Sequence, residues 1–331
     1  MLTLKRILIT GASGQIGQAV TQKLLQYDDE YVISCFMRKS SKNKRIARSF
    51  GKKVDIVWGD IRKRKEVEKA VKSQDIIIHL AFYLPPISIE QFDIAYETNV
   101  KGMENLIQAA QQNNSKILFS SSFATYGDIR SLGDESVPLN QKYNPPPKDY
   151  YSHHKVKCIN LLKESGLDYA IFVLALIPPK KNLLKMSNDQ MFEIPLDTRV
   201  ELADEDDVAE AIVSGLSNGE IWNKTHHIGG GESCRVLYSE FIQKMMTTMG
   251  VGEIPEELFG GEKYHFCYLS SEKTNKLLDY QTHSFEDILN DMKRNNRGLI
   301  FFIRLFRPIV RRILFRSSPY FEKLKNSKNE N

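Results

Sequence analysis

The sequence predicts an α/β protein built on a doubly wound parallel sheet, and two patterns carry this prediction. Short apolar runs rich in β-branched residues alternate with amphipathic helical stretches through the first half of the chain, and a glycine-rich turn follows the first run. Strands that recur with a helix between them require crossover connections, which give parallel pairing and a sheet covered on both faces. A ligand crevice is then expected at the carboxyl ends of the strands.

The ranges of the elements follow from the two hydrophobic periodicities along the chain. Strands are predicted at 6–10, 31–37, 54–58, 75–80, 116–121 and 169–176. Helices are predicted near 15–26, 63–72, 90–113 and 151–165. Beyond Pro178-Pro179 the alternation becomes irregular, so we expect a smaller C-terminal lobe over 177–296 that closes over the crevice and binds the substrate.

The first predicted strand leads into a turn in which glycine recurs every third residue, at Gly11, Gly14 and Gly17. These positions permit a tight turn, a close approach of the backbone to a pyrophosphate, and close packing of helix on strand. The N-terminus of the following helix stabilises phosphate charge. A plain turn is the alternative reading, but the strand–turn–helix context favours a dinucleotide site. The other residues of the turn that we assign to this site are Ser13, Gln15 and Ile16.

A tyrosine and a lysine, Tyr151 and Lys155, lie four residues apart in a predicted helix. At that spacing they share one helix face, and an ammonium beside a phenol lowers the pKa of the phenol. Such a phenol can act as a general acid or base toward an alcohol or a carbonyl. The alternative is an ordinary exposed pair at helical spacing.

Taken in order, these and further motifs resemble the extended short-chain dehydrogenase/reductase superfamily, in particular its NAD-dependent epimerase/dehydratase family. The similar segments are 10–17, 59–61, 79–81, 98–102, 120–127, 151–155, 206–209 and 228–231. The resemblance implies an NAD(P)-binding Rossmann domain with the catalytic helix over 1–176 and a substrate lobe over 177–296. The charge pattern of the chain adds a basic amphipathic tail over 297–331.

The resemblance also implies the roles of individual residues. Tyr151 is the general acid/base, and Lys155 lowers its pKa and holds the nicotinamide ribose. Ser122 binds the reacting oxygen, and Asn99 supports the geometry of proton transfer. The remaining cofactor-binding residues that it implies are Asp60, Ile61, Leu80 and Ala81.

The choice of cofactor depends on the end of the second strand. An acidic residue there would bind an unphosphorylated ribose, whereas this chain has Arg38, whose guanidinium suits a 2′-phosphate. We therefore favour NADP(H) and keep NAD(H) as the other candidate. The alternative is that Arg38 begins a solvated basic turn.

The preferred reaction is net oxidation or reduction of a small-molecule substrate at a carbonyl or alcohol carbon. One alternative is a nucleotide-sugar epimerase or dehydratase that retains NAD. The Arg-Pro usual in this family after the catalytic helix is absent from 172–176, as is a Tyr-Phe-Asn-Pro segment, and these departures count against a standard UDP-sugar substrate. A non-catalytic NAD(P)-binding regulatory or assembly protein is the other alternative, which the presence of both Tyr151 and Lys155 disfavours.

Composition sets the broad class of the protein. With 331 residues, 41% of them hydrophobic, the chain can bury a large core, which excludes a disordered protein. Its four dispersed cysteines and its N-terminal sequence favour a reducing, cytoplasmic location, and no metal site is expected. Residues 297–331 carry nine basic and two acidic side chains, a formal charge of +7. Because the whole chain has a net charge of +5, residues 1–296 carry a net charge of −2. The body of the protein is therefore not expected to bind nucleic acid.

The segment 299–316 reads as an amphipathic helix that Pro308 kinks or splits. One face is arginine-rich, with Arg304, Arg307 and Arg311. The opposite face is apolar and contains Leu299, Phe302, Ile303, Phe306, Ile309, Val310 and Ile313. This pattern suits an anionic membrane surface, which would make the protein peripheral on the inner face of a membrane. Packing on the protein body or on a partner in a homodimer is the alternative.

Overall fold

The computed structural model describes residues 4–133, 135–181, 189–261 and 266–322. Its centre is a seven-stranded sheet in which every neighbouring pair is parallel. In spatial order the strands are β3 (Val54–Trp58), β2 (Tyr31–Met37), β1 (Lys5–Thr10), β4 (Ile76–His79), β5 (Lys116–Ser122), β6 (Tyr169–Leu174) and β8 (Lys224–Ile228). The doubly wound fold is thereby confirmed, and the strand order reverses between β1 and β4, where such folds bind their ligands.

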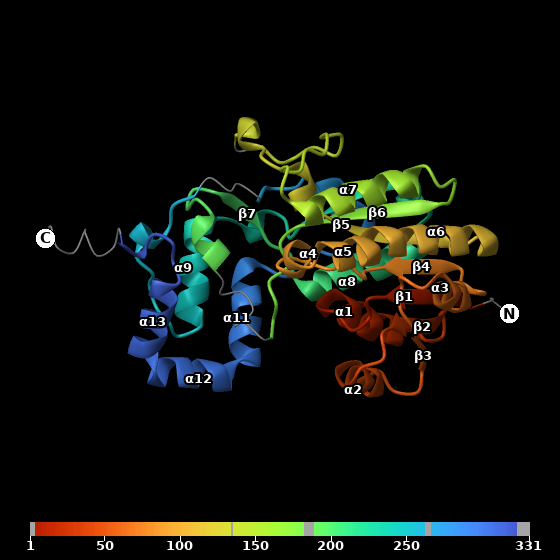
Figure 1. Ribbon diagram of the computed structural model, residues 1–331, viewed down its shortest axis with the longest axis horizontal. Helices are drawn as coiled ribbons and strands as arrows, with labels where there is room; N and C mark the ends of the chain where they lie inside the picture. The colour runs from red at the N-terminus through yellow and green to blue at the C-terminus, as the bar shows by residue number, and fades with distance from the viewer. Residues whose placement is uncertain (1–3, 134, 182–188, 262–265, 323–331) are drawn as a thin grey trace, which may run out of the picture.

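Helices cover both faces of this sheet (Figure 1). On one face α1 (Gln15–Leu24) packs against α8 (Glu205–Ser217). On the other face α3 (Arg64–Val71) packs against α6 (Gly102–Asn113), and α6 packs against α7 (Tyr150–Lys163). Shorter helices, α2 (Ser41–Ser49), α4 (Ile87–Glu90) and α5 (Phe92–Tyr96), flank the carboxyl ends of the strands.

The predicted continuous helix 90–113 is wrong, because it is interrupted at Gln91, between α4 and α5, and again between α5 and α6. Between α5 and α6 the chain forms a π-helical turn, η2 (Glu97–Lys101), in which Asn99 and Val100 are buried. A π-turn holds one more residue than an α-turn, so it shifts the side chains that face the interior. The break therefore allows Asn99 to point into the protein.

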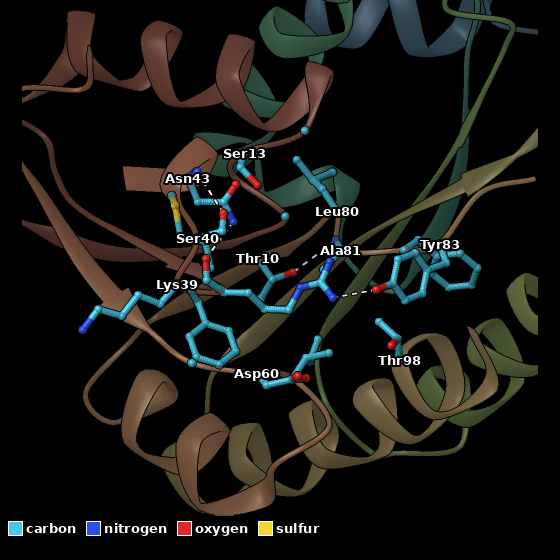
Figure 2. A pocket seen from close by; sticks show the side chains of 18 of the residues that line it. Thr10, Ser13, Lys39, Ser40, Asn43, Asp60, Leu80, Ala81, Tyr83 and Thr98 are labelled. Carbon is cyan, nitrogen blue, oxygen red and sulfur yellow. Dashed lines mark hydrogen bonds between the residues drawn. The ribbon is translucent and has the colours of Figure 1, made fainter. Parts of the chain in front are cut away.

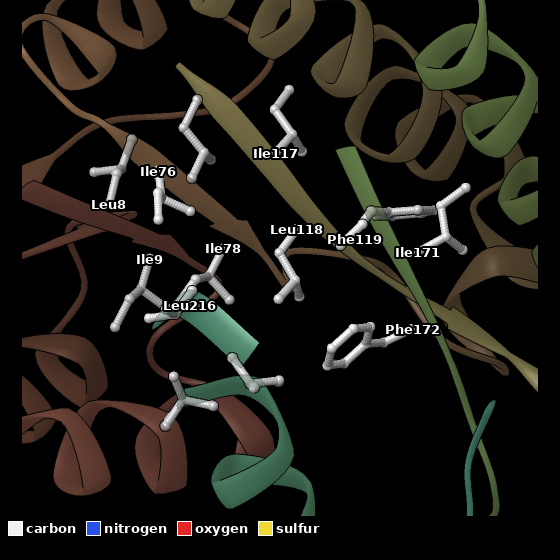
Figure 3. Close-up of a cluster of buried hydrophobic side chains, with 14 of the residues drawn as sticks. Leu8, Ile9, Ile76, Ile78, Ile117, Leu118, Phe119, Ile171, Phe172 and Leu216 are labelled. Atoms are coloured by element: carbon white, nitrogen blue, oxygen red, sulfur yellow. The ribbon is translucent and has the colours of Figure 1, made fainter. Parts of the chain in front are cut away.

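One hydrophobic core joins the sheet to the helices on both of its faces. Side chains from β1, β4, β5, β6 and α8 belong to it (Figure 3), and so do Met103 and Leu106 of α6 on the other face. Although α8, β8 and α10 (Glu272–Leu278) fall within the range predicted for the second lobe, their residues Ile212, Ile228 and Leu278 belong to this first core. The chain thus leaves the sheet region after β6, returns for α8 and β8, and returns again at α10.

A second core holds the smaller lobe together. The antiparallel pair β7 (Arg199–Glu201) and β9 (Arg235–Leu237) packs with α9 (Tyr238–Thr248) and α11 (Phe285–Asn295). Phe241 and Ile288 are buried at this contact. Figure 1 shows this lobe beside the sheet region, with α9 and α11 side by side.

The tail begins with two helices, α12 (Arg297–Leu305) and α13 (Arg307–Arg316), and its last nine residues lie outside the described part of the chain. The expected break at Pro308 is confirmed, because α13 starts one residue before this proline. The predicted single apolar face is wrong: Ile303 is buried against the second core, whereas Phe302 is exposed. Across residues 4–133, 135–181, 189–261 and 266–322, no helix has both the length and the apolar character needed to cross a bilayer.

Candidate active site

A cavity of about 540 Å³ opens at the carboxyl ends of β1, β2, β3 and β4, where the strand order reverses (Figure 2). Eight of the residues predicted to bind the cofactor line it: Gly11, Ser13, Gly14, Arg38, Asp60, Ile61, Leu80 and Ala81. The other predicted cofactor residues, Gln15, Ile16, Gly17 and Lys155, do not line it. The sequence analysis missed a further set of lining residues, which includes Lys39, Ser40, Lys42, Asn43, Phe82, Tyr83 and Thr98.

In the glycine turn the backbone lies too close to neighbouring backbone for a side chain to fit. Gly11 has a φ of +73°, and a Cβ at this position would lie 2.6 Å from the amide nitrogen of Ala81. At Gly17 a Cβ would collide with the carbonyl oxygen of Gly11. Gly14 is the N-cap of α1 and lines the cavity, so the helix N-terminus with its first-turn amides lies beside the cavity. This is the cradle that a pyrophosphate requires.

Gln15 and Ile16 have other neighbours. The Gln15 side chain donates to the carbonyl oxygen of Pro178 at 3.0 Å, which ties the start of α1 to the segment after β6. Ile16 packs against the first core. Both residues therefore stabilise the position of the loop through contacts outside the cavity.

Basic and hydroxyl side chains gather at the far end of the cavity. Arg38 follows β2 directly and donates from Nη1 to the Tyr83 hydroxyl at 2.6 Å (Figure 2). Ser40 caps α2 by accepting from the backbone nitrogen of Asn43 at 3.1 Å, and Asn43 donates from its side chain to the Arg38 carbonyl at 2.7 Å. The first turn of α2 holds no acidic residue. The helix N-terminus and the nearby cations together favour an anion at this end.

Asp60 lies across the cavity from this cluster and already has a partner. Its carboxylate accepts from the Arg62 guanidinium at 2.6 and 3.0 Å, and this hydrogen bond holds the pKa of Asp60 below its usual range. Asp60 is therefore a carboxylate near neutral pH, with its oxygens shared between Arg62 and the cavity.

The predicted catalytic residues Ser122 and Tyr151 come together. Ser122 ends β5 and Tyr151 lies in the first turn of α7, and the Ser122 side chain is close enough to lower the pKa of the Tyr151 phenol. Burial nevertheless raises the pKa of Tyr151 to about 12, against the lowering effect of Ser122. The depressed phenol pKa expected from the Tyr–Lys spacing is thus not found, because burial has the larger effect.

The surroundings of Lys155 explain why it has little effect on the pKa of the Tyr151 phenol. It is buried, its Nζ donates to the carbonyl oxygen of Ser120 at 2.6 Å, and it lies 5.8 Å from the centre of the Tyr151 ring. The rings of Phe82 and Phe119 lie closer, with centres 3.8 and 4.7 Å from Nζ. Burial among these groups lowers the pKa of Lys155 to about 7.

Asn99 is a positioning residue for the cavity wall. Its Oδ1 accepts from the backbone nitrogen of Tyr83 at 2.7 Å, and its Nδ2 donates to the carbonyl oxygen of Tyr83 at 3.2 Å. The same amide lies 3.4 Å from His154. Asn99 therefore fixes the backbone of the residue whose hydroxyl binds Arg38. Aromatic residues directly after the segment 79–81 were the sequence signal that could have indicated Phe82 and Tyr83.

A separate polar cluster lies at the start of α8. Among the described residues, potential metal-ligating atoms of Asp204, Asp206 and His283 lie within 4.8 Å of one another. The Lys180 ammonium lies 2.8 Å from Asp204 and 2.6 Å from Asp206, and His283 lies 2.6 Å from Asp207. These contacts are those of an ion-pair cluster that neutralises the buried Lys180.

Comparison with known proteins matches the chain to one family and one fold. A family model described as the NAD dependent epimerase/dehydratase family matches residues 7–181. A UDP-glucose 4-epimerase from Rickettsia akari (strain Hartford) is 32% identical over 136 residues, which are 39% of this chain and 40% of that protein. The match thus spans less than half of the length of this curated relative.

Solved structures resemble most of the chain. A UDP-glucose 4-epimerase from Thermotoga maritima, solved with UDP-glucose, has a TM-score of 0.73 at 18% identity and covers 88% of this chain and 99% of its own. A dTDP-glucose 4,6-dehydratase from Bacillus anthracis str. Ames, solved with NAD, has a TM-score of 0.72 at 18% identity, covering 89% of this chain and 97% of its own. At such identities the likeness shows a shared fold.

Proposed function

Because the chain belongs to the NAD dependent epimerase/dehydratase family, we propose that it is an NAD(P)-dependent enzyme acting at a carbonyl or alcohol carbon of a small molecule. The observation that carries this proposal is the position of Phe82. Phe82 lines the cavity, its ring centre lies 3.8 Å from Lys155 Nζ, and its ring meets that of Tyr151 edge-on with centres 5.7 Å apart. The cavity and the proton-transfer group therefore adjoin.

The residues present fit a nicotinamide dinucleotide. Gly11 and Gly17 let the turn and the start of α1 pack closely, because a Cβ at either position would collide with backbone. A pyrophosphate would then lie at the N-terminus of α1. The adenosine half would then lie toward Asp60 and Ile61, and the nicotinamide half toward Phe82 and the catalytic helix. When bound, the nicotinamide ring supplies the hydride acceptor or donor.

Side chains of the protein would carry out the proton transfer that accompanies hydride transfer. Tyr151 would take it from an alcohol or give it to a carbonyl oxygen, while Ser122 holds that oxygen by a hydrogen bond. With a pKa of about 7, Lys155 gains or loses its charge near neutral pH. In its protonated form it would favour the phenolate of Tyr151 and so offset the effect of burial on that group.

We favour NADP(H) as the cofactor, with NAD(H) as the alternative. Arg38, Lys39 and Lys42 line the end of the cavity beside the N-terminus of α2, where a 2′-phosphate would gain both charge pairing and amide hydrogen bonds. The neighbouring Ser40 and Asn43 supply further donors. Against this, related structures contain NAD.

A nucleotide-sugar epimerase or dehydratase that retains NAD is the second candidate. The named curated relatives favour it, since they are UDP-glucose 4-epimerases. The sequence around 172–176 favours net oxidation or reduction instead, because it lacks the family's usual Arg-Pro. Homodimer formation and a cytoplasmic location stay predictions.

The proposal is tested by two neighbouring tyrosine variants of the full chain. Tyr151→Phe removes the hydroxyl that contacts Ser122, whereas Tyr150→Phe removes an exposed one that packs beside Phe92. Turnover is measured with NADPH and a panel of carbonyl compounds, and by interconversion of UDP-glucose and UDP-galactose. We expect Tyr151→Phe to bind cofactor normally and lose turnover by about 100-fold or more, while Tyr150→Phe keeps it. Full activity in Tyr151→Phe would refute the assignment.

A further inference from the structure

The helices α12 and α13 lie at the outer edge of the smaller lobe (Figure 1). They expose six large apolar side chains. Each exposes between 49% and 66% of its surface. These residues, here called the tail apolar face, are Phe301, Phe302, Leu305, Phe306, Ile309 and Ile313. Single exposed apolar residues are ordinary, but six within thirteen positions of one segment mark an interaction surface.

The opposite sides of both helices are fixed to the lobe. Ile300 and Ile303 are buried, and Val310 and Leu314 pack against the second core. The resulting anchorage holds the tail apolar face outward, so its exposure is a property of the folded protein.

Two arginines strengthen this anchorage through the backbone of the lobe. Arg307 donates from Nε to the carbonyl oxygen of Val251 at 3.0 Å, and Arg311 donates from Nη1 to that of Glu253 at 2.6 Å. Arg307 and Arg311 were predicted to lie on the helix face opposite the apolar one, and both donate to the backbone of the lobe. Arg312 and Arg316 are exposed, and within the described part of the chain neither makes such a bond.

The charge of the segment selects the kind of partner. Residues 297–316 contain six arginines and no acidic residue. Among the described residues, no carboxylate lies within ion-pair distance of any of these arginines, although Arg294 just before them pairs with Asp291. A partner surface that is apolar inside and negatively charged outside would match both features.

A second copy of the chain is a poor match for an apolar face with an arginine rim. In a two-fold interface the same patch meets itself, so the arginine rim of one copy would face that of the other. A bilayer with anionic lipids offers acyl chains to the apolar side chains and phosphates to the guanidinium groups. We propose that α12 and α13 dock this protein on an anionic phospholipid surface, with the tail apolar face inserted at the headgroup boundary. This inference is independent of the proposed function.

The test uses co-sedimentation of the full chain with vesicles of phosphatidylcholine alone or mixed with phosphatidylglycerol. We expect binding to the mixed vesicles, weaker binding at high salt, and little binding to phosphatidylcholine alone. The double variant Phe301→Ser/Phe302→Ser should bind at least about tenfold more weakly. A control variant, Ile89→Ser/Leu237→Ser, also removes two exposed apolar side chains but outside the tail, and it should bind normally.

A charge variant gives a second, independent readout. Arg312→Glu/Arg316→Glu leaves the apolar face intact and should lower binding to mixed vesicles by about tenfold or more. Circular dichroism of each variant verifies that it is folded. The proposal is overturned if the full chain fails to sediment with mixed vesicles, or if neither tail variant weakens binding. A dimer that Phe301→Ser/Phe302→Ser dissociates, without vesicle binding, would likewise overturn it and assign the face to self-association.

Discussion

The dinucleotide loop can need glycine for two reasons, a positive φ and a close approach of neighbouring backbone, and four glycines of this chain differ in which of the two applies. Gly11 has both a positive φ of +73° and a backbone collision for an added Cβ. Gly17 has the collision alone, and Gly51 has a positive φ of +76° with open space around it. Gly219 has neither constraint. Substitution of each by alanine therefore separates conformational strain from close approach.

The magnitudes follow from these geometries. Gly219→Ala should leave the free energy of unfolding unchanged or raise it by about 0.5 kcal/mol, because it restricts the unfolded chain. Gly51→Ala should lower it by about 1 kcal/mol through left-handed strain. Gly17→Ala should lower it by about 1–3 kcal/mol through overpacking, and Gly11→Ala by about 2–4 kcal/mol because both effects act.

Urea unfolding gives the free energies, and calorimetric titration with NADPH gives cofactor affinity. Only Gly11→Ala and Gly17→Ala should lose affinity, since their collisions lie in the loop that approaches the pyrophosphate. If Gly11→Ala unfolded no more easily than Gly51→Ala and kept its NADPH affinity, the close-approach argument would be refuted.

Three further variants test the electrostatics. Arg38→Asp should reverse the preference of NADPH over NADH, and an unchanged ratio of the two dissociation constants would contradict the role of Arg38. The lowered pKa of Lys155 means that the unfolded chain holds more protons between about pH 7 and 10.5, so stability rises with pH across that window. Lys155→Met should remove this rise and increase the free energy of unfolding at pH 7, measured by urea titration at several pH values; an unchanged pH profile would count against the buried cation. Burial lowers the pKa of His283, but its bond to Asp207 and the negative charges of Asp204 and Asp207 together raise it above its usual value, so its stabilisation is present at low pH and lost as pH rises above about 6.5. His283→Gln should abolish that loss, and a variant that still showed it would exclude His283 as the source.

The strands were the most predictable part of the fold. Six of the seven strands of the sheet are apolar runs that sequence reasoning located within about two residues, because a strand buried on both faces must be apolar throughout. The seventh, β8, was missed because His226 and His227 interrupt its apolar character. In the fold, His227 is buried and contacts the Tyr126 hydroxyl at 2.6 Å, a contact between residues far apart in sequence.

The site was predictable where a motif is local. Gly11 and Gly14 of the glycine turn, together with Arg38 and Asp60, line the cavity as expected. The bond from Arg38 to Tyr83, and the support of Tyr83 by Asn99, join distant segments through a π-turn that no periodicity signals.

Two further properties could not be predicted because they depend on tertiary packing. They are the pKa of Tyr151 and the exposure of the apolar residues of the tail. The phenol pKa depends on burial, which outweighs the spacing to Lys155. In the tail, which apolar residues become exposed depends on how α12 and α13 rotate relative to each other at Pro308 and on the surface that receives them. Periodicity alone grouped Ile303 with Phe302, and tertiary packing separated them.

The central claim is that the crevice between β1 and β4 holds a nicotinamide dinucleotide beside Tyr151. The most direct test is calorimetric titration of the purified full chain with NADPH, NADP, NADH and NAD, after denatured protein has been assayed for released nucleotide. We expect either tight binding of NADPH by protein that carries no nucleotide, or retained NAD, which would select the epimerase or dehydratase candidate. Protein that neither releases nor binds any of the four nucleotides would contradict it.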